Sequence, residues 1–232
     1  MKSAWNALKF LTLAGRFGTV PVAPEEIGAA AAYFPVVGAM LGLTLILLHR
    51  VVEPFLESEI EAAVLVLALI IMTAALHLEG TQKTFDQLLS LNEGNAVTVY
   101  GIVALILVIT LKIRSIEVMG ETRNVNLLLA PVMARWGLVI FLYGPVRAGD
   151  EPASRIARGV SIWHIIIASL ATLVLAVYFT GRVGLWVCLC VSLLALLGRS
   201  YFHKRRAGFN YDNLGAIVEV GETLGFVLLA SL

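Results

Sequence analysis

Long apolar runs separated by short polar stretches are the main pattern along this chain. Several runs approach the roughly 20 mostly apolar residues that a helix needs to cross a bilayer, and most hold no charged residue. Only Gly181-Arg182 separates the fifth run from the sixth, so these two are expected to form a helical hairpin. The pattern predicts an all-α polytopic membrane bundle, a single membrane domain over residues 1–232 of about seven transmembrane helices. The expected spans are 27–48, 62–78, 94–111, 124–146, 159–181, 183–198 and 213–232.

Residues 1–18 differ from these runs because basic residues interrupt their apolar positions. Lys2, Lys9 and Arg16 recur every seven positions and therefore lie along one stripe of a helix. This pattern predicts an amphipathic helix in the headgroup region of the membrane. A signal peptide is the alternative, but the charges break its apolar core and no small-residue cleavage site follows closely. Pro35, inside the first span, predicts a kink there.

Composition supports a protein that lives in lipid. Hydrophobic residues make up 59% of the chain and charged residues 14%, against about a quarter charged in an ordinary soluble domain. These values exclude a disordered protein, a coiled coil and a typical soluble enzyme. The net charge of +1 gives no field that would attract nucleic acid. Cys188 and Cys190 lie in one apolar run, which is not a disulfide framework.

The distribution of lysine and arginine predicts the orientation, because short cytoplasmic loops carry an excess of basic residues. Eleven basic residues fall on the amino-terminal side of the spans: Lys2, Lys9, Arg16, Lys83, Arg147, Arg155, Arg158, Arg199, Lys204, Arg205 and Arg206. Five fall on the other side: Arg50, Lys112, Arg114, Arg123 and Arg182. We therefore expect a multi-pass protein of the cell (inner) membrane, with its amino terminus and its functional site facing the cytoplasm.

Ionisable residues at four places in or near the spans stand out, since such residues are costly in a membrane and usually face a cavity or a partner. His77 and Glu79 end the second span, and Glu79, Lys83 and Asp86 share one face if that helix continues. Arg135 lies inside the fourth span.

The last span contributes three more acidic residues. Asp212, Glu219 and Glu222 share one face, and Gly215 on the same side allows another backbone or a ligand to approach closely. Carboxylates from two helix ends are the hard oxygen ligands that suit Mg²⁺, which usually also keeps waters and a substrate phosphate. Arginine is the favoured bidentate binder of phosphate, so Arg135 completes a predicted phosphate-handling site at the membrane surface.

Structural interpretations of the same residues remain open. Glu79 and Lys83 have the spacing of an ordinary helical ion pair. His77 could cap its span at the interface. Arg135 could pair with Glu219 or Glu222 only to neutralise buried charge.

The order of these motifs resembles the cobalamin synthase family, the adenosylcobinamide-GDP ribazoletransferases. Residues 77–86 are similar to that family's signature His-x-Asp-Gly-x-x-Asp-Thr-x-Asp, with Glu79 and Lys83 in place of its first two aspartates. Residues 100–113 look like its third span, residues 130–135 like its Ala-x-x-x-x-Arg element, and residues 212–222 like its last signature. The resemblance covers nearly the whole chain.

The resemblance implies the reaction. Phosphoryl-cobinamide is transferred from adenosylcobinamide-GDP to the 5′-hydroxyl of α-ribazole or its phosphate, which gives adenosylcobalamin and GMP, with Mg²⁺ as cofactor. The implied roles are catalytic for His77, Asp86 and Asp212, substrate-phosphate binding for Arg135 and Lys83, and metal binding for Glu79, Asp86, Asp212, Glu219 and Glu222. The expected partners are membrane lipid and these two small-molecule substrates, with no nucleic acid and with a homo-oligomer left open.

Three other functions remain. One is a family member with diverged or lost activity, because Lys83 places a cation on the expected metal face and the Asp-Ser-Arg stretch that the family carries before its third span is missing. Another is a phosphoalcohol transferase acting on lipid head groups, although its paired Asp-Gly and Gly-x-x-x-Asp-x-x-x-Asp signature is absent. The third is a small transporter that uses Glu219 and Glu222 as an ion site.

Overall fold

A computed structural model describes residues 2–17, 22–89, 97–145, 151–204 and 210–232. Residues 94–96 of the expected third span, residue 146 of the fourth, and the basic residues Arg147, Arg205 and Arg206 lie outside the described parts. Within those parts the chain is helical and contains no strand, as the apolar pattern predicts. The longer helices are α1 (Lys2–Leu11), α3 (Phe34–Val52), α4 (Ser58–Met72), α5 (Leu76–Leu89), α6 (Val99–Glu117), α7 (Arg123–Leu142), α9 (Ile162–Thr180), α10 (Arg182–Lys204) and α11 (Tyr211–Ser231).

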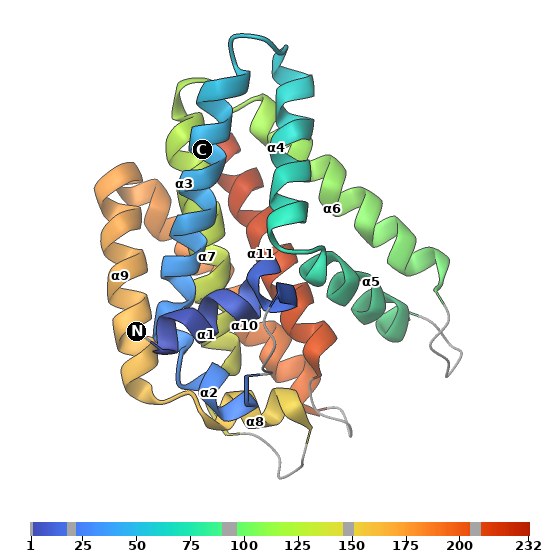
Figure 1. Ribbon diagram of the computed structural model, residues 1–232, viewed down its shortest axis with the longest axis vertical. Helices are drawn as coiled ribbons and strands as arrows, with labels where there is room; N and C mark the ends of the chain where they lie inside the picture. The colour runs from blue at the N-terminus through green and yellow to red at the C-terminus, as the bar shows by residue number, and fades with distance from the viewer. Residues whose placement is uncertain (1, 18–21, 90–96, 146–150, 205–209) are drawn as a thin grey trace.

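Shorter elements connect the longer helices. Two helices, α2 (Pro24–Gly28) and α8 (Pro152–Arg158), and the 3₁₀ turns η1 (Leu13–Phe17), η2 (Ala31–Tyr33) and η3 (Gly120–Thr122) complete the described chain. Arg155 of α8 donates two hydrogen bonds to Glu25 of α2, at 2.7 and 3.1 Å. These bonds hold the pKa of the Glu25 carboxyl below its ordinary value. The pair ties α2 and α8 together across the lower end of the bundle in Figure 1.

Six helical segments of the described chain are long and apolar enough to cross a membrane, or seven if the bent pair α4–α5 counts as one span. The predicted hairpin is present: α9 and α10 pack together, and Gly181 turns the chain between them with a φ of 58°. The kink predicted at Pro35 is wrong. Pro35 lies in the first turn of α3, where a proline displaces no helical hydrogen bond.

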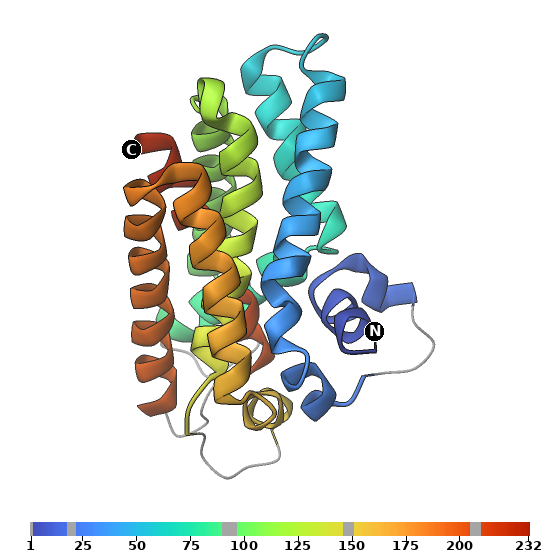
Figure 2. The same cartoon turned by 90° about the vertical axis from the view of Figure 1, so that its left-hand side faces the viewer.

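Helix α7 is the centre of the bundle. Inside the molecule, 83% of the most apolar stretch of Gly120–Leu142 is buried, whereas only 17% of the corresponding stretch of α9 is buried. Helices α3, α9, α10 and α11 pack around α7 (Figures 1 and 2). The outward side chains of α9 are large and apolar, which is typical of a helix that faces lipid.

Helix α1 lies across the bundle instead of along it (Figures 1 and 2). Its inner face buries Ala7 and Leu11, while Trp5 is 52% exposed. Lys9 lies over the Trp5 ring, at 5.8 Å from the ring centroid. This crosswise position is the one expected of the amphipathic amino-terminal helix, and it places Phe10 and Leu11 beside the site described below.

A buried charged cluster closes the opposite end of the bundle. Arg123 of α7 donates to Glu61 of α4 at 2.6 Å and to Ser58 at 2.7 Å, and Glu61 also contacts His49 of α3. Glu61 is buried and contacts both Arg123 and His49. The cluster therefore joins three helices at the end of the bundle farthest from α8.

Candidate active site

The second predicted span does not continue as one helix over 62–78. It breaks after α4, and α5 leaves the break at 88° to α4. Ala74 and Ala75 adopt φ angles of 54° and 57°, which residues other than glycine rarely adopt. Thr73 donates its hydroxyl to the Leu69 carbonyl at 2.9 Å, and Arg16 reaches the Ala74 carbonyl at 3.4 Å. The strained turn directs the start of α5 into the bundle.

Two glycines allow α5 to approach α11 closely. A methyl group on Gly80 would lie 2.6 Å from the Asp212 backbone oxygen and 3.0 Å from the Gly215 Cα atom. Asn213 also donates to Thr84 across this contact, at 3.1 Å. The close approach brings the two acidic helix ends together, as the sequence predicts for Glu79 and Asp212.

A cavity of about 300 Å³ lies beside this helix contact. Helix α1 forms part of its wall, and the Phe10 ring lies 6.3 Å from the Tyr211 ring between their centroids. The cavity is lined by both polar and apolar residues. The lining residues are Phe10, Leu11, Leu76, His77, Glu79, Gly80, Leu138, Tyr211, Asp212, Leu214 and Gly215.

Charged groups of both signs lie at the cavity, since Glu79 lines it and Lys83 pairs with Glu79. Lys83 donates to Glu79 at 2.6 Å, and about half of each side chain is exposed. The ion pair expected from the i, i+4 spacing is therefore present, and Asp212 faces the same pair. Because Glu79 and Lys83 are half-exposed, each is available to a ligand that enters the cavity.

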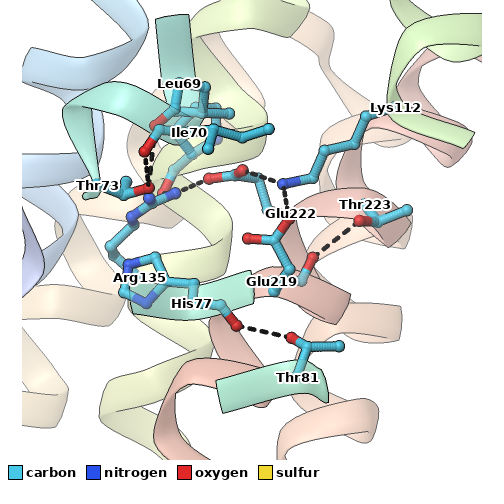
Figure 3. Close-up of polar contacts among 11 residues, drawn as sticks. Leu69, Ile70, Thr73, His77, Thr81, Lys112, Arg135, Glu219, Glu222 and Thr223 are labelled. Atoms are coloured by element: carbon cyan, nitrogen blue, oxygen red, sulfur yellow. Dashed lines mark hydrogen bonds and ion pairs between the residues drawn. The ribbon is translucent and has the colours of Figure 1, made fainter. Parts of the chain in front are cut away.

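A second charged group is buried deeper in the bundle, between α6, α7 and α11 (Figure 3). Lys112 of α6 donates to Glu219 at 2.5 Å and to Glu222 at 2.6 Å, and Arg135 of α7 donates to the other oxygen of Glu222. All four side chains are at least nine-tenths buried. Two cations and two anions balance, so the pairing that the sequence left open for Arg135 is present.

Buried polar atoms without a hydrogen-bond partner lie beside this group. Among the described residues they include the donors Nε and Nη2 of Arg135 and the ring atom Nε2 of His77. Figure 3 shows His77 next to Arg135, and His77 also lines the cavity. His77 therefore lies between the cavity and the buried arginine. Unpaired buried donors are uncommon and call for an explanation.

Asp86 has a different environment from the other predicted site residues. It accepts hydrogen bonds from the backbone amides of Thr98 at 3.1 Å and Gly101 at 2.9 Å. The Thr98 hydroxyl and the Gln82 amide also donate to it. These contacts satisfy amide groups at the beginning of α6, which is the work of a helix cap. Asp86 does not meet Glu219 or Glu222 in the buried group.

The predicted metal ligands thus separate into three places. Among the described residues, no group of three or more His, Cys, Asp or Glu side chains has the geometry of a metal centre. Glu79 and Asp212 share the cavity, Asp86 caps α6, and Glu219 and Glu222 are neutralised by two cations. Two carboxylates on an accessible cavity fit a site for Mg²⁺ that is completed by water and phosphate oxygens.

The sequence analysis missed Lys112 as a site residue. It assigned this lysine to a loop, because the predicted third span ended at residue 111, whereas α6 continues to Glu117. The signal that could have found it is a lysine followed by further apolar residues, Ile113 and Ile116, at helical spacing. The roles of Phe10 and Leu11 in the cavity wall were also missed, since residues 1–18 were treated only as a membrane-surface helix.

Comparison with known proteins gives one consistent result. The family described as Cobalamin-5-phosphate synthase matches residues 3–230. A protein of Geotalea daltonii named adenosylcobinamide-GDP ribazoletransferase is 27% identical, over 97% of this chain and 96% of its own length. Proteins with the same name from Roseiflexus sp. and Pseudomonas fluorescens are each 30% identical, over 97% and 94% of this chain and 87% and 95% of their own lengths. No solved structure matches.

Proposed function

The chain belongs to the cobalamin-5-phosphate synthase family, transferases of cobalamin biosynthesis, and from that premise we propose the reaction it carries out. Phosphoryl-cobinamide passes from adenosylcobinamide-GDP to the 5′-hydroxyl of α-ribazole or its 5′-phosphate. The bond between phosphorus and the bridging oxygen of GMP breaks, and a bond from phosphorus to the 5′-oxygen forms. GMP leaves, and the hydroxyl gives up its proton.

The observation that carries this proposal is that buried hydrogen-bond donors of Arg135, without partners among the described residues, lie next to the cavity. Phosphoryl transfer is catalysed mainly by positioning and by neutralising charge. Glu79 and Asp212 face the cavity, and Arg135 lies behind His77 with its Nε and Nη2 atoms unpaired among the described residues. A substrate that carries a pyrophosphate brings the oxygen acceptors that these arginine donors lack among the described residues.

Each residue can be given a task on this proposal. The Arg135 guanidinium binds a phosphate oxygen through Nε and Nη2, and Lys83 binds another at the cavity. The unpaired His77 Nε2 accepts the proton of the attacking hydroxyl. Asp86 supports the helix end next to α5, and Glu219 and Glu222 hold the cations in place.

Glu79 and Asp212 are the residues that would hold Mg²⁺. Mg²⁺ typically binds through one or two carboxylates together with substrate phosphates, and both side chains line the cavity. The ion, when bound, would neutralise charge on the pyrophosphate. Lys83 then works beside it as a second positive group.

We place the protein in the inner membrane with this cavity open to the cytoplasm. The support is the excess of basic residues on the side that carries α1, α2 and α8. A transporter would need Glu219 and Glu222 as an ion site. Their carboxylates are instead paired with Lys112 and Arg135, which disfavours that alternative.

The proposal is tested with purified protein in detergent, supplied with adenosylcobinamide-GDP, α-ribazole and Mg²⁺. We expect cobalamin and GMP to appear in equal amounts, and neither to appear without α-ribazole. GMP release without cobalamin would indicate hydrolysis and contradict the proposed acceptor. No product from folded protein would identify a member of the family that has lost this activity.

A further inference from the structure

We propose that Lys112 is a positioning residue, which occupies Glu219 and Glu222 so that Arg135 keeps two N–H groups available for a phosphate. The inference rests on the proposed function, because it takes Arg135 to be the group that meets the substrate phosphate. The motif at residues 100–113 contains this lysine but gives it no role, and its position in the bundle is what suggests the task.

The contacts of the Lys112 ammonium are specific. It lies 2.5 Å from Glu219 Oε1 and 2.6 Å from Glu222 Oε1, and its side chain is 3% exposed. It therefore takes one oxygen from each of two carboxylates that are one turn apart on α11. Only the second oxygen of Glu222 is used by Arg135. Lys112 therefore determines how many carboxylate oxygens remain available to Arg135.

Without this lysine the buried group would have one cation for two carboxylates. Arginine carries a fork of donors that readily binds carboxylates in pairs. Arg135 would then turn its remaining donors toward Glu219, the carboxylate that had lost its partner. Buried charges are strongly driven to such pairing because solvent does not screen them. The two N–H groups that are now unpaired would be lost to a ligand.

The competing explanation is that Lys112 only neutralises buried charge. Both explanations predict that removing the lysine lowers stability. They differ for phosphate binding by the folded Lys112→Met variant, which is weakened only if the lysine keeps Glu219 away from Arg135. If the lysine positions Arg135 by occupying Glu219, then Lys112→Met becomes harmless to phosphate binding once Glu219→Gln is added. Arg135 and Glu222 then remain as a balanced pair.

The test measures binding of inorganic pyrophosphate to the full chain in detergent by titration calorimetry, so it does not require transfer activity. We expect Lys112→Met to weaken binding by about tenfold or more, the effect of losing a hydrogen bond to a charged group. The double variant Lys112→Met/Glu219→Gln should return to within about threefold of the original chain on the same scale. Arg114→Met, two residues further along α6 in an exposed pair with Glu117, is the matched control and should bind unchanged.

Three results would overturn the inference. These are an original chain that does not bind pyrophosphate, a folded Lys112→Met variant that binds it normally, and a folded double variant that stays weak. If Lys112→Met alone does not fold, a double variant that folds but binds pyrophosphate weakly still overturns the inference. A chain that binds pyrophosphate in the expected pattern but forms no cobalamin would refute the proposed function and leave this inference standing.

Discussion

The acidic residues Glu79, Asp86, Asp212, Glu219 and Glu222 do different work in the folded protein. All five lie near helix ends or inside apolar runs, and their spacing alone does not distinguish them. They differ in the basic side chains and backbone amides that surround them, and most of these neighbours come from distant parts of the chain. Lys112 is more than 100 residues from Glu219, and Asp86 is bound by amides of the following helix. Such contacts depend on packing, which a single sequence does not display.

Asp86 provides a prediction about stability. Replacement by alanine removes the acceptor for the amides of Thr98 and Gly101. We expect the free energy of unfolding to fall by about 1–2 kcal/mol, the usual cost of losing a helix cap. Asp86→Asn, which keeps one carbonyl oxygen, should lose less. Denaturant unfolding in detergent measures both, and a stable Asp86→Ala variant with a changed Mg²⁺ requirement would instead favour the predicted metal role.

Lys83 provides a prediction about substrate binding. Its pair with Glu79 is half-exposed, so Lys83→Ala should change stability by less than about 1 kcal/mol. If the ammonium binds a phosphate, KM for adenosylcobinamide-GDP should rise about tenfold. Steady-state kinetics with varied donor substrate measures this, and an unchanged KM would leave Lys83 as an ion pair only.

The reversed substitution at the same position separates a working enzyme from a lapsed one. Lys83→Asp restores the acid of the family signature and should increase the dependence on Mg²⁺. If this variant gains activity that the original chain lacks, the chain is a family member that has lost its function.

Most of the long helices could be predicted from the sequence, but the break between α4 and α5 could not. Apolar runs of sufficient length locate α3, α6, α7, α9, α10 and α11 to within several residues at most ends. The break between α4 and α5 escaped prediction because Ala74 and Ala75 carry its left-handed backbone. Such turns are usually recognised by glycine or asparagine, and two alanines give no such signal. The orientation of α5, and hence of the cavity, follows from this turn.

The contact between α5 and α11 gives a prediction at the same scale. Gly80→Ala would place a methyl group 2.6 Å from the Asp212 backbone oxygen, so α5 must move away from α11. We expect a loss of roughly 1–3 kcal/mol in stability and a large loss of turnover, since Glu79 and Asp212 separate. Gly221→Ala on α11 is the matched control, because its methyl group would have no neighbour closer than 3.8 Å. Equal effects of the two substitutions would contradict the close-packing explanation.

At the scale of the whole molecule, the bundle has two distinct ends. One end carries α1, α2 and α8 (Figure 1), with the cavity beside α1. The cluster of Arg123, Glu61 and His49 joins α7, α4 and α3 at the other end. The sequence predicted the two ends through its basic residues, but it did not reveal the ion pairs at each of them. The end farthest from α8 has the buried cluster of Arg123, Glu61 and His49, and the other has the exposed pair of Arg155 with Glu25. Those pairs join helices that are far apart in the chain, so no local pattern marks them.

Membrane orientation is tested by cysteine labelling in a chain from which Cys188 and Cys190 have been removed. Glu57→Cys and Glu151→Cys place reactive groups at exposed positions at opposite ends of the bundle. We expect a membrane-impermeant maleimide to label position 57 in intact spheroplasts and to label position 151 only after the membrane is opened. The reverse pattern would show that the topology is inverted.

The central claim is that Glu79 and Asp212 form the site of a Mg²⁺-dependent transfer, and turnover as a function of Mg²⁺ concentration tests it most directly. Glu79→Gln and Asp212→Asn should each lower turnover by about tenfold or more and shift the Mg²⁺ response to higher concentration. Both should remain folded by size-exclusion chromatography. Glu59→Gln, an exposed acid of α4, should behave like the original chain. Turnover that persists in both cavity variants, or that is unaffected by a chelator in the original chain, would contradict the account.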